Sequence, residues 1–404
     1  MTTTALPPGP ADTVLDHVGT ARLFRLQRLV PNGTGRLWVK WERANPGGSA
    51  EDRPARHIVD VAERRGLLRP GGTIVEASSG DFGVSLAMVG AARGYRVIVV
   101  VGPEASAATR AALRAFGAEV VLAADGVRDG SDGAASESPA AVANRLARGI
   151  PDAFRPDQRL SLLDSQAHYL TTAREILEET GGDFDILVAP VGAGGQLAGL
   201  SRRLREQAPH VRVVAADLPA ATRSPGSGRG WIAWNLDLGL IDAAYRVPTA
   251  DAAGACRALA RHEGVLTGPV SGAAALVGLR EALTAGPGAR VVAVLADGGD
   301  RHLDTVYDDG WLAGRGLPVA VPTLPELRAR ARGIVPVGAA PGTAASGGMS
   351  GGMSGAAVGT ANGTANGTAH GAATGAARIP AAAMAGAVTS RLAFDPHRSW
   401  EDPA

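Results

Sequence analysis

The stretch Asp185-Ile-Leu-Val-Ala-Pro-Val-Gly-Ala-Gly-Gly-Gln-Leu-Ala-Gly199 joins an apolar strand to a glycine-rich turn and the start of a helix. Similar apolar runs recur along the chain, and a segment with helical periodicity follows most of them. The other runs are 73–76, 96–101, 119–122, 211–215 and 291–295. Strands without polar interruptions that alternate with helices predict an α/β fold, in which helices cover both faces of parallel sheets.

The composition narrows the possible functions. The 404 residues include 40 Lys and Arg against 39 Asp and Glu, which gives a formal net charge of +1. This balance argues against a polybasic nucleic-acid-binding protein. Only one of the cationic residues is a lysine, Lys40, so a mechanism that needs a lysine amine has one candidate. The single cysteine, Cys256, and the spacing of the eight histidines predict no metal site.

The cellular compartment is also suggested by the sequence. Residues 1–19 contain Thr and Pro where a secretory signal needs a basic flank and an apolar stretch. The longest apolar runs are too short to cross a bilayer. We therefore expect a cytoplasmic protein that binds neither a membrane nor nucleic acid.

Three turns follow predicted strands and could together form a ligand site. Gly192, Ala193, Gly194, Gly195 and Gln196 open a helix, where backbone N–H groups can hold an anion. Tight packing without a ligand explains such a glycine turn equally well.

The second and third turns carry polar side chains. Ser78, Ser79 and Gly80 follow the run 73–76, at the end of a strand where open α/β sheets bind ligands. The alternative is that these serines only cap the next helix. The segment 296–301 would form a third wall, and the three turns together favour a site for a small anionic ligand.

Many spaced motifs of this chain resemble the cysteine synthase and cystathionine β-synthase family of fold-type-II pyridoxal phosphate enzymes. The resemblance covers residues 19–317. The motifs are Val39-Lys-Trp-Glu42, Asn45-Pro-Gly-Gly-Ser49, Asp52-Arg53, Glu76 to Gly83, Gly117-Ala118, His168-Tyr-Leu-Thr-Thr172, Gly192 to Gly195, Gly228-Arg-Gly-Trp231, Gly264, Ser271-Gly-Ala273 and Asp300-Arg301 with Leu303 and Thr305.

The resemblance implies a two-lobe homodimer that binds pyridoxal phosphate through a lysine and eliminates a β-substituent from an activated serine before adding a nucleophile. It implies a larger lobe from residues 1–44 and 161–330 and a smaller lobe from 45–160. Residues 336–387, rich in Ala, Gly, Thr and Ser, read as a disordered tail, and 388–404 as a short C-terminal peptide.

The family's cofactor lysine lies in a Ser-Val-Lys-Asp-Arg stretch, which reads Ser49-Ala-Glu-Asp-Arg53 in this chain. The resemblance therefore places Glu51 at the Schiff-base position, and a carboxylate cannot form an imine. Lys40 matches an ordinary strand position of the family, so we do not expect it to reach the cofactor aldehyde.

Other positions of the expected pocket depart from the family in the same way. Asp81 replaces the Asn that contacts the cofactor's phenolic oxygen, and Phe82 replaces a Thr that holds the substrate carboxylate. Ala193 and Gln196 replace two hydroxyl donors to the phosphate. Gly298 corresponds to the serine that faces the pyridine nitrogen, although the adjacent Asp297 could contact that nitrogen instead. Gln158 fits a family residue that helps to bind the substrate carboxylate, so Ser78, Ser79, Gly80, Phe82 and Gln158 form the candidate substrate site.

These changes alter the charge of the expected pocket. Two unit charges about 4 Å apart interact by about 4 kcal/mol at an effective dielectric constant of about 20. Glu51 and Asp81 would thus repel a phosphate and a phenolate unless the carboxylates were protonated. We expect that pyridoxal phosphate binds weakly at best. The protein could also work without any cofactor.

Two functions remain open from the sequence. The first is a cysteine synthase-like protein without lysine chemistry, repurposed for an amino-acid-like or anionic small ligand, for acid/base chemistry with Glu51 and Asp81, or as a regulatory partner of an active relative. The second is a pyridoxal phosphate enzyme that performs β-replacement or β-elimination on a preformed aldimine, with Glu51 as the base. Two solvated carboxylates in an inactive pocket would also explain the pattern.

Overall fold

A computed structural model of the chain describes residues 11–123, 137–217 and 236–337. These residues contain two sheets flanked by helices, which confirms the predicted α/β fold. The motif at 228–231, residues 338–387 of the expected tail and the C-terminal peptide lie outside the described residues. The first two residues of the expected tail are described, and Pro336 and Val337 pair with Tyr245 and Ala244.

The larger sheet has six strands in the order β1-β2-β10-β7-β8-β9. Its strands are β1 (Leu23–Arg25), β2 (Arg36–Trp41), β7 (Ile186–Pro190), β8 (Arg212–Asp217), β9 (Ala243–Arg246) and β10 (Arg290–Leu295). All neighbouring strands are parallel except β1, which pairs antiparallel with β2. This edge pair is a feature that the alternating pattern did not predict.

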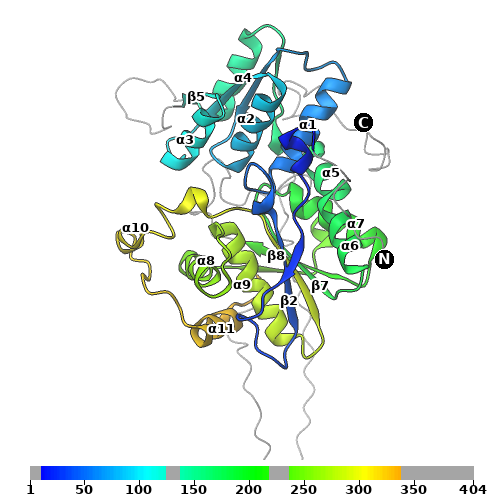
Figure 1. Cartoon of the computed structure of the whole chain (residues 1–404), viewed down its shortest axis with the longest axis vertical. Coiled ribbons are helices and arrows are strands. Elements are labelled where there is room, and N and C mark those ends of the chain that lie inside the picture. Colours follow the sequence, from blue (N-terminus) through cyan, green and yellow to red (C-terminus); the bar gives the residue numbers. More distant parts are fainter. Residues whose placement is uncertain (1–10, 124–136, 218–235, 338–404) are drawn as a thin grey trace, which may run out of the picture. The chain divides into compact units, whose positions relative to one another are not determined.

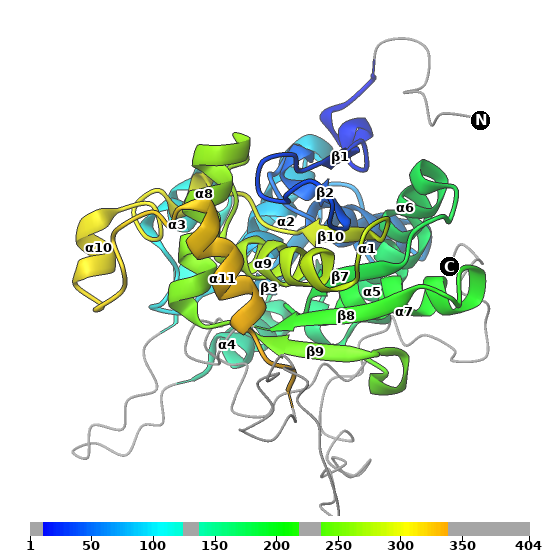
Figure 2. The same ribbon diagram turned by 90° about the horizontal axis from the view of Figure 1, so that it is seen from below.

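Helices cover both faces of the larger sheet (Figure 1). One face packs against α8 (Thr249–Glu263), α9 (Pro269–Thr284) and α11 (Leu324–Gly333). The other face packs against α6 (Thr172–Thr180) and α7 (Gly195–Gln207). Figure 2 shows these two groups of helices on opposite sides of β7 and β8.

The smaller sheet has four parallel strands in the order β5-β4-β3-β6. Its strands are β3 (Thr73–Ala77), β4 (Arg96–Val101), β5 (Glu119–Leu122) and β6 (Ala153–Phe154). Its helices are α1 (Asp52–Arg64), α2 (Asp81–Arg93), α3 (Ala107–Ala115) and α4 (Pro139–Gly149). The helix α5 (Leu162–Leu170) follows β6, and the short α10 (Asp309–Ala313) follows β10.

The packing of β4 explains why its sequence is apolar without interruption. Val97, Val99 and Val101 belong to the core cluster that also contains residues of α1 and α2. Ile98 and Val100 belong to the cluster that contains residues of α4. Successive side chains of a strand point to opposite faces, so a sheet covered on both sides needs apolar residues at every position.

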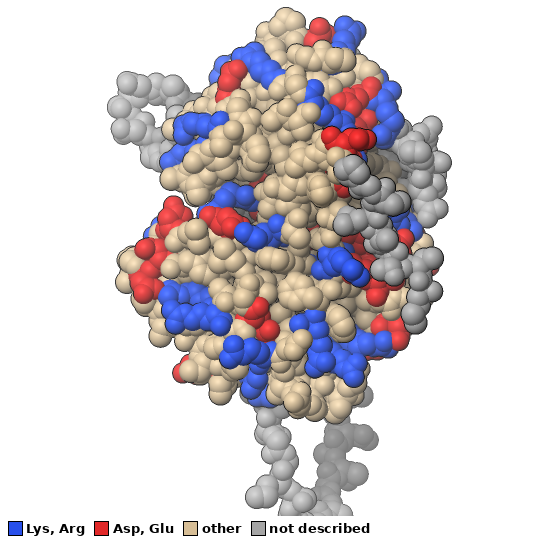
Figure 3. Space-filling model, viewed as in Figure 1, with Lys and Arg blue, Asp and Glu red and all other residues tan. Residues whose placement is uncertain are grey.

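Figure 3 shows acidic and basic side chains interspersed over the drawn face rather than gathered into one basic patch. Among the described residues no helix is long and apolar enough to cross a membrane.

The strand order brings the predicted site segments to the carboxyl ends of parallel strands. β2, β10 and β7 are neighbours in the larger sheet, and β3 and β6 are neighbours in the smaller sheet. In the smaller sheet β4 and β5 lie on one side of β3 and β6 lies on the other, which makes the β3/β6 boundary a topological switch point. Ligands of open α/β sheets bind at such a point.

The contact between α7 and α5 gives a test of the fold. A Cβ atom on Gly199 would lie 2.2 Å from the carbonyl oxygen of Ser165 and 2.7 Å from the backbone nitrogen of Tyr169. Backbone atoms cannot move away as a side chain can, so Gly199→Ala should lower the free energy of unfolding by about 1–3 kcal/mol. Urea denaturation measures this change.

The matched control for this substitution is Gly149→Ala in α4. No atom lies within 4 Å of a Cβ atom built on Gly149. Alanine there should leave the stability unchanged or raise it by up to about 1 kcal/mol. Equal stabilities of the two variants would contradict the close packing of α7 on α5.

Candidate functional site

Glu51 follows β2 and stands immediately before α1, at the N-cap position of that helix. Its side chain is half-buried and does not cap the helix. Instead Oε2 accepts a hydrogen bond from Nε2 of Gln158, at a distance of 2.6 Å. Gln158 begins the 3₁₀ turn η3 (Gln158–Leu160), which follows β6. The structure thus brings together two residues that the sequence analysis assigned to the site.

Asp164 is a third member of this group, and the sequence analysis did not identify it. The same Nε2 atom of Gln158 lies 3.3 Å from Oδ1 of Asp164, which is only 2% exposed. A Cβ atom on Gly195 would lie 1.9 Å from Oδ2 of Asp164, so this carboxyl group fills the space beside the glycine turn. We call Glu51, Gln158 and Asp164 the carboxyl–amide group.

The two carboxyl groups favour protonation. Burial, followed by the neighbouring charges of Asp164 and Asp81, holds the pKa of Glu51 well above its usual range. Burial raises the pKa of Asp164 to about 7. Two carboxyl groups around one amide cannot both ionise without repulsion, so the pair retains a proton near neutral pH. Such a pair can both donate and accept a proton.

Asp81 lies at the start of α2 and is paired with a cation rather than with Glu51. Nε of Arg301 donates to Oδ1 of Asp81 at 2.9 Å, and Nη2 donates to the same oxygen. Asp81 is therefore not the uncompensated negative charge that was expected from the sequence, because Arg301 is its partner. Arg301 also lies in a predicted wall of the site, the segment after β10.

The serine turn after β3 is largely satisfied by backbone contacts. Oγ of Ser78 accepts a hydrogen bond from the backbone nitrogen of Gly83 at 3.0 Å, and Oγ of Ser79 accepts one from Gly102 at 3.0 Å. Gly80 is the N-cap residue of α2. Phe82 is 3% exposed and belongs to the core of the smaller sheet. The structure therefore places Phe82 in the hydrophobic core.

The glycine turn after β7 has the backbone conformation that could bind an anion at the start of a helix. Gly194 is the N-cap residue of α7 with φ at 96°, a left-handed conformation that favours glycine. Gly192 is exposed, and Ala193 offers no hydroxyl group. Nε2 of Gln196 is shielded from solvent and has no hydrogen-bond partner among the described residues. The turn is thus open on the side of Gly192 and blocked by Asp164 on the side of Gly195.

The turn after β10 is held by a buried aspartate. Asp297 accepts hydrogen bonds from the backbone nitrogen of Ser271 at 2.7 Å and from its Oγ at 2.5 Å. Gly298 is enclosed, because a Cβ atom there would lie 2.9 Å from both Cγ of Arg43 and the carbonyl oxygen of Gly48. A serine at this position would therefore need its neighbours to move.

Lys40 belongs to a buried ion network. Its Nζ lies 2.9 Å from Glu175 and 2.8 Å from Glu179, both on α6, and the residue has no exposed surface. Arg53 joins the same network by hydrogen bonds to Glu175 and to Glu42. This contact set agrees with the expectation that Lys40 has a scaffold role.

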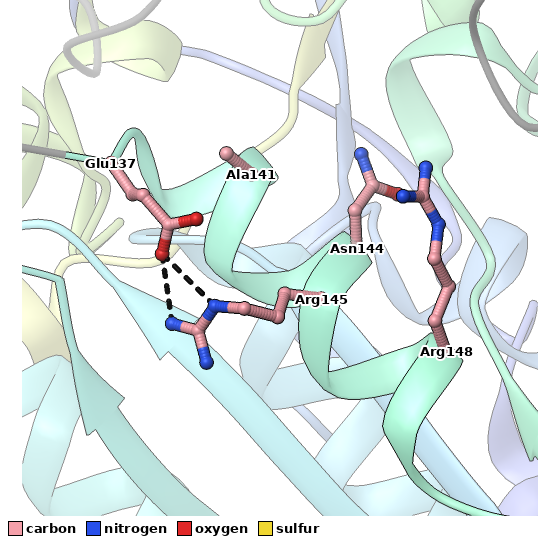
Figure 4. Close-up of a pocket in the computed structure, with 5 residues that line it drawn as sticks. All are labelled: Glu137, Ala141, Asn144, Arg145 and Arg148. Atoms are coloured by element: carbon pink, nitrogen blue, oxygen red, sulfur yellow. Dashed lines mark hydrogen bonds and ion pairs between the residues drawn. The ribbon is translucent and has the colours of Figure 1, made fainter.

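Other candidate sites in the described part of the chain are weaker. A hollow of about 380 Å³ is lined by Glu137, Ala141, Asn144, Arg145 and Arg148 (Figure 4). All five come from α4 or the two residues before it, and none belongs to the predicted site. The described residues contain no group of three or more His, Cys, Asp or Glu that could hold a metal ion.

Sequence reasoning missed Asp164 because its context looks ordinary. Ser161 caps α5, and an acidic residue three positions after a serine cap is common at a helix start. The only available signal was its place shortly after Gln158, in the connection that follows β6.

Comparisons with known proteins agree on one family. The family model described as "Pyridoxal-phosphate dependent enzyme" matches residues 14–297. Cysteine synthase B of Escherichia coli (strain K12) is 36% identical over 297 residues, which cover 72% of this chain and 95% of that protein. N-(2-amino-2-carboxyethyl)-L-glutamate synthase of Cupriavidus metallidurans is 34% identical over 331 residues, which cover 78% and 95%.

A solved structure gives the same result for the fold. The crystal structure of O-ureido-L-serine synthase superposes with a TM-score of 0.66 at 36% sequence identity. The match covers 76% of this chain and 100% of that one.

The carboxyl–amide group predicts a pH-dependent effect of Glu51→Gln. In the wild type, the pKa of Glu51 is raised in the folded state, so the unfolded state ionises first as the pH rises through about 4.5. The wild type therefore loses stability toward higher pH, while the variant does not titrate. The stability of the variant relative to the wild type should rise between pH 5 and pH 8 by more than about 1.4 kcal/mol, the equivalent of one pKa unit.

Urea denaturation at several pH values checks this prediction, with Glu119→Gln as the control. Arg96 lowers the pKa of the exposed Glu119, so this carboxyl group titrates below the tested range and the relative stability of its variant should stay nearly constant between pH 5 and pH 8. A relative stability of the Glu51 variant that does not change with pH would contradict a protonated carboxyl group.

The ion network predicts that Lys40→Met is strongly destabilising. Removing the cation leaves the Glu179 carboxylate with only the hydrogen bond from the backbone nitrogen of Leu23 and leaves part of the Glu175 charge uncompensated, at a cost of about 3–5 kcal/mol. Arg96→Met removes an exposed ion pair with Glu119 and should change stability little. Urea denaturation of both variants distinguishes a scaffold lysine from a free one.

Proposed function

Because the chain belongs to the family of pyridoxal-phosphate-dependent enzymes and is cysteine synthase-like, we propose that it has lost the lysine chemistry of that family and binds an amino-acid-like small ligand without a covalent bond. The homodimer expected from the family is part of this proposal. The two sheets and their turns remain as a scaffold, and the residues that would react with the cofactor differ.

One observation carries the proposal: no amine is available at the position where the family forms its imine. By motif, Glu51 occupies that position, and its carboxyl group accepts a hydrogen bond from Gln158. Lys40 is the only lysine of the chain, and Glu175 and Glu179 hold its ammonium group in a buried ion network. A nitrogen that is held in these contacts and has no exposed surface is not free to reach an aldehyde.

The residues present do not fit pyridoxal phosphate. By motif, a carboxyl group at Glu51 replaces the amine that would react with the aldehyde. A second carboxyl group, of Asp164, lies against Gly195 in the turn expected to hold the phosphate. The turn has also lost two hydroxyl donors at Ala193 and Gln196. Gly298, expected near the pyridine nitrogen, is enclosed by Arg43 and Gly48.

The carboxyl–amide group supports a different use of the same scaffold. A protonated carboxyl group beside an ionised one can hydrogen-bond a ligand that carries both donors and acceptors, as an amino acid does. Glu51 and Asp164, rather than Glu51 and Asp81, would then be the pair able to hold and release a proton. Arg301 neutralises Asp81 and removes it from that role.

The proposal predicts that the purified protein forms no imine with pyridoxal phosphate. A visible imine band and a borohydride-trapped adduct should be absent in the wild type and in Lys40→Arg. A thermal-shift screen of amino-acid-like compounds, including O-acetylserine and O-phosphoserine, should find a stabilising ligand whose effect is lost in Gln158→Ala.

Two results would oppose this function. A wild-type imine that disappears in Lys40→Arg would mean that Lys40 reacts with the cofactor and that the lysine chemistry of the family is retained. A band that forms only with pyridoxal phosphate and a serine derivative together would instead favour the external aldimine, with Glu51 as the base.

A further inference from the structure

One guanidinium group joins three segments that surround the site. Arg301 lies in η6 (Asp300–His302), which follows β10 of the larger sheet. Its Nε and Nη2 donate to Asp81, the first residue of α2 in the smaller sheet. Its Nη1 donates to the carbonyl oxygen of Gly47 at 3.1 Å, in the connection between β2 and α1.

This contact is shielded from water, which strengthens it. The side chain of Arg301 is 13% exposed and that of Asp81 is 22% exposed. Burial lowers the pKa of Arg301, but the charges of Asp81, Asp52 and Asp297 outweigh that effect and raise it. Arg301 therefore stays charged, and it is attracted by carboxyl groups on all three segments.

The backbone already brings two of these segments together. Ser49 forms an isolated bridge with Asp297, and the backbone nitrogen of Ala50 donates to the carbonyl oxygen of Ala296 at 2.8 Å. Both contacts lie between the β2–α1 connection and the turn after β10. The ion pair of Asp81 and Arg301 adds α2 to them through side chains alone, so substitution can remove it without changing the backbone contacts.

We propose that the Asp81–Arg301 ion pair is a latch that holds α2 against the turn after β10 and excludes a ligand of the size of pyridoxal phosphate, whether or not a lysine is present. This inference rests on the proposed function and predicts that a lysine at position 51 alone does not restore cofactor binding. Two features would then prevent cofactor binding: the missing amine, and the contact that holds α2 against the turn after β10.

The test places a lysine at the imine position and opens the latch separately. Four variants are compared: Glu51→Lys alone, and Glu51→Lys combined with Asp81→Asn, with Arg301→Gln or with Asp300→Asn. Each is incubated with pyridoxal phosphate, reduced with borohydride, and assayed for the trapped adduct at residue 51 by mass spectrometry, together with the absorbance of the imine.

The control variant Asp300→Asn and the second latch variant Arg301→Gln distinguish an opening of the latch from a change in the charge of the site. Asp300→Asn makes the same carboxylate-to-amide change one residue from Arg301, but it breaks an exposed pair with Arg43. Arg301→Gln opens the latch and makes the site more negative, so electrostatics alone would predict less phosphate binding. The latch predicts at least tenfold more adduct with Asp81→Asn and with Arg301→Gln than with Glu51→Lys alone, and no gain with Asp300→Asn.

A second measurement uses the chain with Glu51 intact and no cofactor. Hydrogen exchange of peptides covering residues 45–52 and 80–88 should accelerate in Asp81→Asn and Arg301→Gln, and the double variant should add little to either single one. Asp300→Asn should leave both peptides at the wild-type rate.

Several results would overturn the latch. These are a Glu51→Lys protein that traps as much cofactor as the opened variants, opened variants that trap no more than Glu51→Lys, or unchanged exchange in both peptides. Failure of the proposed function looks different, since the wild type itself would then form an imine, either at Lys40 or between pyridoxal phosphate and a serine derivative.

Discussion

The buried ion network around Arg53 and Lys40 is the constraint on which the site depends. Arg53, in the first turn of α1, is bonded to Glu42 after β2 and to Glu175 on α6. Lys40 connects the same Glu175 to Glu179. Charges buried in this way are stable only while every partner is present. The network therefore fixes the start of α1, and with it Glu51, relative to β2 and α6.

A fixed start of α1 also determines the electrostatics of the site. Glu51 lies near Asp52, Asp81 and Asp164, an arrangement that would be repulsive if all four carboxyl groups were ionised. The structure relieves this repulsion in three ways. Asp81 pairs with Arg301, Asp52 accepts hydrogen bonds from Gly47 and Ser85, and Glu51 and Asp164 favour protonation around Gln158.

The sequence predicted the fold well because the fold depends on local patterns. The apolar run at β4 must be covered on both faces, and the glycine turn after β7 must begin a helix, so both could be read without the structure. The contacts of the site depend instead on residues far apart in the chain. Asp81 and Arg301 are 220 positions apart, and Asp164 resembles an ordinary acidic residue at a helix start. Phe82 follows the site turn in sequence, but it lies on the buried face of α2, so its side chain packs in the core.

The position of Lys40 has a consequence for the chemistry of the whole molecule. The other cationic side chains of the Lys and Arg class are arginines, and Lys40 has no exposed surface. Reagents and enzymes that modify lysine side chains, such as acylating agents and acetyltransferases, therefore meet no accessible ε-amine on the folded protein.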